Sequence, residues 1–438
     1  MIWCMSSTRA TLLVTLTGPD RPGVTSTVFA ALAPHDVEVL DVEQNLVRGQ
    51  LTLGLLLDPS SSTAEVEATL RTKADELGLA AAIEHGQGDN RARRSGRVSV
   101  VVLGRPVRAG AVAAVTHSIS EHGANIDRVR RLSRDPVTTL ELDISGADVP
   151  RLRRELALVA TAHGVDIAVA PGGLARRGRR LVVMDVDSTL IQDEVIELLA
   201  DHAGRGAQVA AVTESAMRGE IDFTESLHQR VAALEGLPVT VFDEVRAAVR
   251  LTPGARTLVR TLKRLGFTVA VVSGGFIEIV GPLAQELGID HAHANRLEVQ
   301  DGRLTGRVEG EVVDRAAKAT ALQRFAADAG LPLSRTVAVG DGANDLDMLA
   351  IAGLGVAFNA KPVVQQQADT TVNVPHLDAV LFMLGISREE VEEADLLDET
   401  TMPDRGSLRP RPEEEARPEG SGDESTDAHP PAAGDAAP

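Results

Sequence analysis

Two aspartates one residue apart, Asp185 and Asp187, follow a short apolar run at 181–184. The run is typical of a buried strand, and side chains two residues apart in a regular strand share a face. At the carboxyl end of a strand in an open α/β sheet, both carboxylates would project into the ligand-binding crevice. Two adjacent anions repel each other, so the pair favours a divalent metal with oxygen ligands, such as Mg²⁺. For the motif taken alone, a buried strand with a polar end is the alternative.

Two further apolar runs that are followed by polar residues lie downstream. An apolar run at 268–272 ends in a serine and two glycines, and another at 336–339 is followed by Gly-Asp-Gly-Ala-Asn-Asp. A lysine lies between them in a stretch with helical spacing. Taken singly, this lysine could be a solvated helix residue and the serine a helix N-cap. The residues of these segments that could do chemistry are Ser273, Gly274, Lys318, Asp341, Asn344 and Asp345.

The order Asp-x-Asp-Ser-Thr, Ser-Gly-Gly, Lys, Gly-Asp-Gly-x-Asn-Asp resembles the haloacid dehalogenase superfamily of phosphatases over residues of about 180–385. The residues around these motifs resemble the phosphoserine phosphatases within it. The resemblance implies a Rossmann-like α/β domain with a small helical cap, and the helical pattern at about 191–250 would be that cap.

The same resemblance implies the roles of the acids. Asp185 would be the nucleophile and form an aspartyl-phosphate, and its carboxylate is ionised at neutral pH, so it needs placement more than activation. Asp187 would protonate the leaving seryl oxygen and then activate water. Mg²⁺ would be held by Asp185, the backbone carbonyl of Asp187 and Asp341, and Asp345 would support the metal-bound waters.

The remaining implied residues bind substrate. Ser273, the Gly274 amide and Lys318 would hold the phosphoryl oxygens, and Asn344 would orient substrate or phosphate. In the cap, Glu194 would meet an ammonium and Arg230 a carboxylate through a bidentate fork, unless both are ordinary surface charges. Met217 and Phe223 would shape the apolar wall. If both charged roles hold, the pocket would recognise O-phospho-L-serine, and the resemblance then implies the last step of L-serine biosynthesis.

Several other functions stay open at this point. The chain could act on another phosphoester, such as phosphothreonine or a phosphorylated protein side chain, or transfer the phosphoryl group to a second alcohol. It could also be an amino-acid sensor with an inactive phosphatase body. A P-type pump shares the aspartyl-phosphate chemistry but needs membrane helices, and no apolar run approaches the length of about 18 residues that a span requires.

The N-terminal part contains an internal repeat. Gly18 and Gly104 occupy equivalent places, as do His35 and His122, and the repeated order predicts two βαββαβ units of ferredoxin-like fold. The turn after the first strand resembles the amino-acid-binding ACT domain. This implies an effector such as serine or glycine at Gly18 and Asp20, more weakly at Gly104, and assembly into a homodimer or larger oligomer. Alternatively the units are scaffolds whose glycines serve only tight turns.

Local patterns predict the elements of the first copy and two features farther on. Asp-Gly within 297–306 is typical of a β-hairpin turn, and Thr-Pro-Gly at 252–254 predicts a helix opening with proline in its first turn. In the first copy we expect strands at 11–17, 37–43 and 50–57 and helices at 24–33 and 63–79. The predicted domains are 1–90 and 96–170 (ACT-like), 171–180 (linker), 181–387 (phosphatase) and 388–438 (acidic tail, disordered from about 400).

Composition limits the partners. The 438-residue chain has a net charge of −19, and residues 388–438 hold 16 acids and five arginines, a net charge of −11. Such a balance does not suggest a nucleic-acid binder. The single cysteine, Cys4, cannot form an intrachain disulfide, which is typical of a reducing cytoplasm. We therefore expect a cytoplasmic enzyme that binds neither nucleic acid nor membrane.

Overall fold

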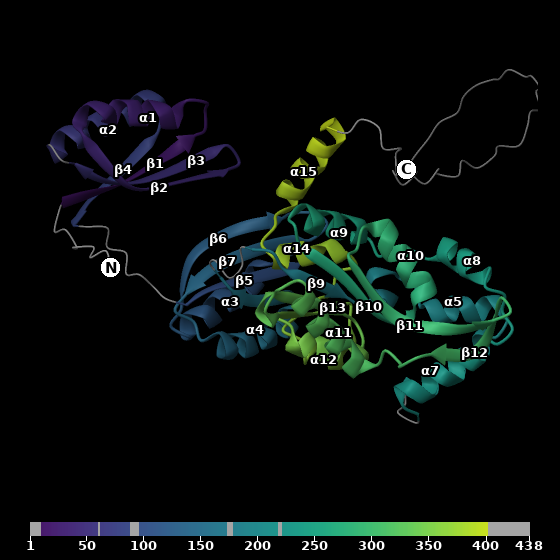
Figure 1. Cartoon of the computed structure of the whole chain (residues 1–438). Helices are drawn as coiled ribbons and strands as arrows, with labels where there is room; N and C mark the ends of the chain where they lie inside the picture. The colour runs from purple at the N-terminus through teal and green to yellow at the C-terminus, as the bar shows by residue number, and fades with distance from the viewer. Residues whose placement is uncertain (1–9, 60–61, 88–95, 173–177, 218–220, 402–438) are drawn as a thin grey trace, which may run out of the picture. The chain divides into compact units, whose positions relative to one another are not determined.

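The structure is a computed structural model that describes residues 10–59, 62–87, 96–172, 178–217 and 221–401. The chain divides into two compact units, residues 1–95 and 96–438 (Figure 1). The predicted disorder from about 400 falls almost entirely on 402–438, outside the described residues.

The first unit is an antiparallel sheet of order β2-β3-β1-β4 with two helices. Alternate residues of the central strand, Leu12, Val14 and Leu16, are fully buried in one cluster with the apolar residues of the helices. The βαββαβ prediction is confirmed. The last strand was not predicted, because its Ala-Ala-Ala start lacks the β-branched alternation of a strand. The elements are β1 (Ala10–Pro19), α1 (Val24–Leu32), β2 (Val37–Val47), β3 (Gln50–Pro59), α2 (Thr63–Leu77) and β4 (Ala80–Gln87).

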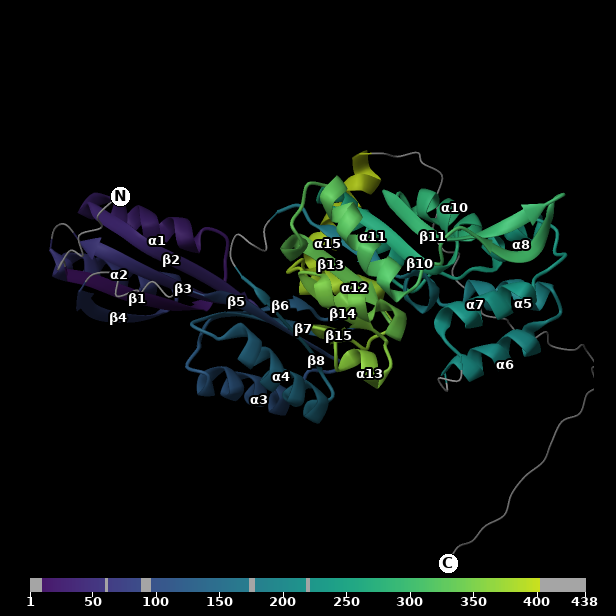
Figure 2. The same cartoon turned by 60° about the horizontal axis from the view of Figure 1, so that its bottom comes forward.

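The second copy opens the second unit and repeats the topology, with strand order β6-β7-β5-β8. Its elements are β5 (Arg97–Gly104), α3 (Ala109–Glu121), β6 (Asn125–Ser133), β7 (Thr138–Ser145), α4 (Val149–His163) and β8 (Asp166–Pro171). Val100 and Val102 pack against its own helices. Val101 and Leu103, on the other face, belong to the buried cluster of the larger domain that follows. The second copy is therefore packed onto that domain, with β8 beside β15 (Figure 2).

The larger domain is built on a seven-stranded sheet of order β12-β11-β10-β9-β13-β14-β15, parallel except for β12. The strands are β9 (Leu181–Met184), β10 (Thr268–Phe276), β11 (His291–Gln300), β12 (Arg303–Glu309), β13 (Thr336–Gly340), β14 (Leu354–Phe358) and β15 (Thr370–Val372). In β9, Leu181 and Val183 join one buried cluster and Val182 and Met184 another, because helices cover both faces. Since β9 lies between β10 and β13, its carboxyl end is the topological switch point of the sheet.

The first four α-helices after β9 form the predicted cap: α5 (Val195–His202), α6 (Gly206–Met217), α7 (Phe223–Ala232) and α8 (Val241–Ala248). Figure 2 shows α5, α6 and α7 gathered at one side of the sheet. A bridge between Ile191 and Leu251 joins the two chain segments that enter and leave the cap. The other helices are α9 (Ala255–Arg264), α10 (Ile277–Leu287), α11 (Arg315–Asp328), α12 (Leu346–Ile351), α13 (Pro362–Gln365), α14 (Val380–Met383) and α15 (Arg388–Thr401).

Two turn predictions have opposite outcomes. The hairpin is confirmed: Asp301 and Gly302 join β11 to β12 with φ of 52° and 73°, the pair of positive values that a type I′ turn needs. The placement of Pro253 in the first helical turn is wrong, because α9 begins at Ala255. Gly254, with φ of 83°, provides the left-handed residue before the helix, so the proline precedes it.

The acidic tail begins as a helix. In α15, Asp395 forms ion pairs with Arg260 and Arg264 of α9. The start of the tail is thus attached to the folded domain through its charges. Among the described residues, none of the helices combines the length and apolar character needed to cross a bilayer.

Candidate active site

Three carboxylates meet at the carboxyl ends of the two central strands. Asp185 follows β9, and Asp341 and Asp345 follow β13. Each offers an oxygen, and these oxygens lie within 4.8 Å of one another. The pairing of β9 with β13 fixes this geometry, and the Asp185 amide extends it by donating to the Val339 carbonyl at 2.9 Å. The structure thus brings together acids that are more than 150 residues apart in sequence.

Lys318 supplies a positive charge inside this cluster. It has no exposed surface, and its Nζ lies 2.8 Å from Asp185 Oδ2 and 2.7 Å from Asp345 Oδ1. Asp345 is held further by the Gly342 amide, which donates to its Oδ2 at 3.0 Å. The solvated-lysine alternative is therefore wrong: the ammonium is buried and directed at the acids.

Asp187 reaches the site through a turn and not through strand geometry. Strand β9 ends at Met184, and a kinked turn follows in which Ser188 has a φ of 56°. The expectation that the two aspartates share a face of a regular strand is thus wrong in detail. Asp187 accepts hydrogen bonds from the Val195 amide at 2.8 Å and from Ser273 Oγ at 2.9 Å. These bonds connect β9, the cap and β10 at one carboxylate.

Burial raises the pKa values of three acids at the site. Burial, and then the charge of Asp345, raises the pKa of Asp185, which Lys318 partly offsets. Burial also raises the pKa of Asp187. Burial and Asp345 raise the pKa of Asp341 to about 6. Burial alone would lower the pKa of Lys318, but Asp185 and Asp345 raise it above its usual value, so the lysine stays charged.

Three cap residues face this cluster. Glu194, directly before α5, accepts a hydrogen bond from Ser188 Oγ at 2.8 Å. Burial, and then the charge of Asp187, raises the pKa of Glu194 to about 7. Burial lowers the pKa of Arg230, which the charges of Glu194 and Asp187 oppose. A Cβ atom on Gly274 would lie 3.1 Å from the ring of Phe223, so this ring packs directly against the glycine.

Two predicted residues are less defined. Asn344 lies half-buried in the turn Ala343–Asp345, between two acids of the cluster. Met217 is the last residue of α6, and its side chain lies outside the described part of the structure.

The predicted regulatory residues belong to the two N-terminal βαββαβ copies and not to the sheet that carries the cluster. Gly18 belongs to β1 and pairs with Leu51, so its placement in the turn is wrong. A Cβ atom there would lie 2.7 Å from Leu79 Cδ2, and close packing is what requires the glycine. Gly104 ends β5 in a similarly crowded position. Asp20 is exposed, and its amide donates to the Gly49 carbonyl at 2.8 Å.

Sequence reasoning missed three polar residues around the cluster. Ser188 bonds to Glu194 as described, and Thr189 Oγ1 donates to Asp341 Oδ1 at 3.1 Å. Both directly follow Asp187, so the motif itself contained a signal. Asn295 is buried in β11 and bonds to the Gly274 carbonyl, and no motif marked it.

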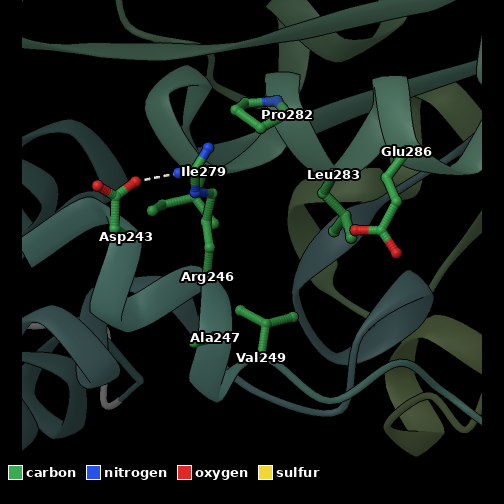
Figure 3. Close-up of a pocket in the computed structure, with 8 residues that line it drawn as sticks. All are labelled: Asp243, Arg246, Ala247, Val249, Ile279, Pro282, Leu283 and Glu286. Atoms are coloured by element: carbon green, nitrogen blue, oxygen red, sulfur yellow. Dashed lines mark hydrogen bonds and ion pairs between the residues drawn. The ribbon is translucent and has the colours of Figure 1, made fainter.

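A cavity of about 390 Å³ lies elsewhere, between α8 and α10 (Figure 3). None of the predicted site residues lines it. Its walls are formed by Asp243, Arg246, Ala247, Val249, Ile279, Pro282, Leu283 and Glu286. This cavity is therefore separate from the carboxylate cluster.

The domain families that match the chain agree with this architecture. The haloacid dehalogenase-like hydrolase family matches residues 182–350, and ACT domain families match 10–84 and 97–170. The predicted domain boundaries lie close to these ranges and stay predictions.

Relatives with names extend over most of the chain. A phosphoserine phosphatase of Streptomyces coelicolor is 60% identical over 389 residues, which cover 88% of this chain and 95% of the relative. Phosphoserine phosphatase SerB2 of Mycobacterium tuberculosis is 52% identical over 393 residues, covering 88% and 96%. The crystal structure of a probable phosphoserine phosphatase from Vibrio cholerae, in unliganded form, matches with a TM-score of 0.54 and 35% identity, covering 69% of this chain and 91% of that one.

The fold and the site are those of a haloacid dehalogenase-like hydrolase preceded by two ACT domains. Within that class, the chain belongs to the phosphoserine phosphatase family.

Phosphatases of this class use a metal ion, and the residues present fit one. Asp185, Asp341 and Asp345 offer the oxygen donors that hard cations prefer. With Asp187 the site has four acids, and Lys318 balances one negative charge. A divalent cation would compensate much of the remainder.

Proposed function

We propose that the chain hydrolyses O-phospho-L-serine to L-serine and phosphate, as the last step of L-serine biosynthesis. The observation that carries the proposal is that two cap residues of opposite charge, Glu194 and Arg230, interact electrostatically with each other and with Asp187 at the carboxylate cluster. The names of the two bacterial relatives support the same substrate.

The reaction begins at Asp185. Its Oδ attacks phosphorus, the bond from phosphorus to the seryl oxygen breaks, and an aspartyl-phosphate forms. Asp187 gives its proton to the seryl oxygen, and the raised pKa of Asp187 supports this acid role. In the second step Asp187 takes a proton from water, whose oxygen attacks phosphorus. Phosphate leaves, and Asp185 returns to its free carboxylate.

The phosphoryl oxygens are held by Lys318, Ser273 and the Gly274 amide. Ser273 donates its hydroxyl hydrogen to Asp187 in the structure, so donation to phosphate requires this hydroxyl to rotate. Lys318 already lies beside the attacking carboxylate and needs no movement. Asn344, on the opposite turn, orients the bound group.

We propose that the metal ion is Mg²⁺, which Asp185, the backbone carbonyl of Asp187 and Asp341 would hold, while Asp345 would support its waters. When bound, it supplies positive charge that offsets the repulsion between the acids and the phosphate dianion.

The cap provides the specificity. Glu194 meets the ammonium of the substrate, Arg230 its carboxylate, and Met217 and Phe223 the short side chain. A site built to pair both charges rejects analogues that lack them, because the buried partners would then be unpaired.

The test is phosphate release from O-phospho-L-serine, phosphothreonine, a phosphotyrosine peptide and p-nitrophenyl phosphate, with Mg²⁺ or EDTA. Asp185→Asn is the blank. Preference for phosphoserine by orders of magnitude, lost in the blank and in EDTA, is expected. Equal rates on all substrates would be consistent with the phosphatase reaction but would refute phosphoserine as the specific substrate. No turnover with Mg²⁺ would favour an amino-acid sensor with an inactive phosphatase body.

The ACT domains add a regulatory proposal. An amino acid such as serine or glycine binds near Gly18 and Asp20 in the first copy, and the chain forms a homo-oligomer. The enzyme is cytoplasmic, for which the single cysteine is the support. Thermal shift with each amino acid measures effector binding, and light scattering measures the subunit number.

A further inference from the structure

The ladder between β10 and β11 is interrupted beside the active site. Ser273 pairs with Ala294, and the next pair is Phe276 with Asn295. Gly274 and Gly275 therefore leave the ladder. Between these two pairs the chain moves on by one residue in β11 and by three residues in β10. Peptide groups that leave a buried ladder need other hydrogen-bond partners.

The side chain of Asn295 is one of these partners. It is 1% exposed, and its Nδ2 donates to the Gly274 carbonyl at 2.8 Å. At the other end of the same peptide group, the Gly275 amide donates to Ser273 Oγ at 2.7 Å. The peptide between the two glycines is thus held at both its oxygen and its nitrogen.

Asn295 also reaches a second segment. Its Oδ1 accepts from the Val313 amide at 2.7 Å. Val313 precedes Asp314, which caps α11 by accepting from the Ala317 amide at 2.8 Å. Lys318 is the next residue. One buried amide therefore connects the glycine loop to the helix that carries the active-site lysine.

The chemistry of this connection requires an amide. The Gly274 carbonyl needs a donor and the Val313 amide needs an acceptor, and asparagine supplies one of each. The hydrogen bond from Asn295 also directs the Gly274 carbonyl toward β11. Rotation of this peptide toward the acids would direct its oxygen at the phosphate dianion, which would be repelled.

We propose that Asn295 is a positioning residue for the phosphoryl-binding groups. It fixes the Gly274–Gly275 peptide and the start of α11 relative to each other, so that the glycine loop and Lys318 act on the same phosphoryl group. It does so without touching substrate. The proposal rests on the proposed function, in which these groups bind the phosphoryl oxygens.

Two variants separate the contacts. Asn295→Asp keeps the shape and the acceptor for Val313 but removes the donor to Gly274. Asn295→Ala removes both, and it is the second variant should the aspartate disturb folding. The matched control is Thr370→Val, which removes a buried hydrogen bond of 2.9 Å from Thr370 Oγ1 to the Ile167 carbonyl, away from the site.

For each folded variant, kcat and KM for O-phospho-L-serine, the inhibition constants of inorganic phosphate and of L-serine, and Tm are measured. Displacement of reacting groups by about 1 Å can cost up to about 100-fold in rate. We expect kcat of Asn295→Asp to fall by about 10- to 100-fold. Phosphate inhibition should weaken by at least about tenfold, and L-serine inhibition should stay within about twofold. The control should lose Tm without these kinetic changes.

Three outcomes would overturn the proposal. In the first, folded Asn295→Asp or Asn295→Ala keeps the wild-type kcat and phosphate inhibition. In the second, phosphate inhibition and L-serine inhibition weaken equally. In the third, Thr370→Val shows the same kinetic losses. If the wild-type enzyme does not prefer phosphoserine, the proposed function fails alone. The role of Asn295 is then decided with p-nitrophenyl phosphate turnover and phosphate inhibition.

Discussion

Lys318 allows the electrostatics of the site to be tested directly. It is fully buried between Asp185 and Asp345, and Lys318→Met removes the ammonium while keeping most of the side-chain volume. Breaking a buried ion pair by removing one partner costs about 3–5 kcal/mol, because the other charge is left uncompensated. For a large folded unit, 1 kcal/mol corresponds to about 2–4 °C in Tm. In EDTA we therefore expect Tm to fall by roughly 6–20 °C.

Circular dichroism during heating gives Tm, and three comparisons define the result. Adding Asp345→Asn to Lys318→Met should recover part of the lost Tm, because it removes one of the uncompensated acids. Phosphatase activity should stay at least about 100-fold below wild type in both variants, since the positive charge that binds the phosphoryl oxygens is missing. Lys263→Met removes the exposed pair with Asp290 and should cost at most about 1 kcal/mol.

An unchanged Tm in Lys318→Met would refute the reasoning, because it would mean that the acids are neutralised by their own protons. So would a further loss of Tm on adding Asp345→Asn. Equal losses in Lys318→Met and Lys263→Met would show that burial of the pair does not set its contribution.

Two further predictions concern the cap. Since the pKa of Glu194 is raised to about 7, its carboxylate is ionised above that pH and protonated below it. KM for O-phospho-L-serine should therefore rise as the pH falls through about 7, and Glu194→Gln should remove this dependence; p-nitrophenyl phosphate, which lacks the ammonium, should not show it. Gly274→Ala should lower kcat/KM by about tenfold or more, because its Cβ would lie 3.1 Å from the Phe223 ring. Phe223→Leu should recover part of that loss, and additive losses in the double variant would contradict the contact.

The reacting acids could be predicted because the sheet does most of the positioning. Asp185, Ser273 and Asp341 each follow a continuous apolar run, and the carboxyl ends of neighbouring parallel strands meet at one edge. The order of the four motifs along the chain then indicated the family. The way in which Asp187 enters the site was not predictable from strand periodicity, because β9 stops at Met184 and a turn begins at Val186.

Asn295 illustrates a role that a single sequence does not reveal. It lies within an ordinary strand, and its importance comes from a ladder interruption that involves two strands. Its partners, Gly274 and Val313, are separated from it by about twenty residues on either side. Only the three-dimensional register shows that one amide meets both.

The two ACT copies differ in a way that their sequences do encode. At the repeat spacing, Thr15 and Thr17 of the first copy correspond to Val101 and Leu103 of the second. A strand that is apolar on both faces is typically covered on both, and these two residues are buried in the cluster of the phosphatase domain. The repeat predicted the same fold for both copies, whereas this difference indicates that the second copy packs against the phosphatase domain of its own chain.

The surface for oligomer formation is therefore expected on the first copy. Its edge strand β2 has eleven residues and exposes Val42, Leu46 and Val47 by 47%, 56% and 70%. A long apolar edge is a template for pairing with another chain. Removing residues 1–95, which form a separate compact unit, should convert an oligomer into a monomer in light scattering while phosphoserine turnover continues. An oligomer that survives this truncation would place the assembly surface within 96–438, and the exposed residues of β2 would need another explanation.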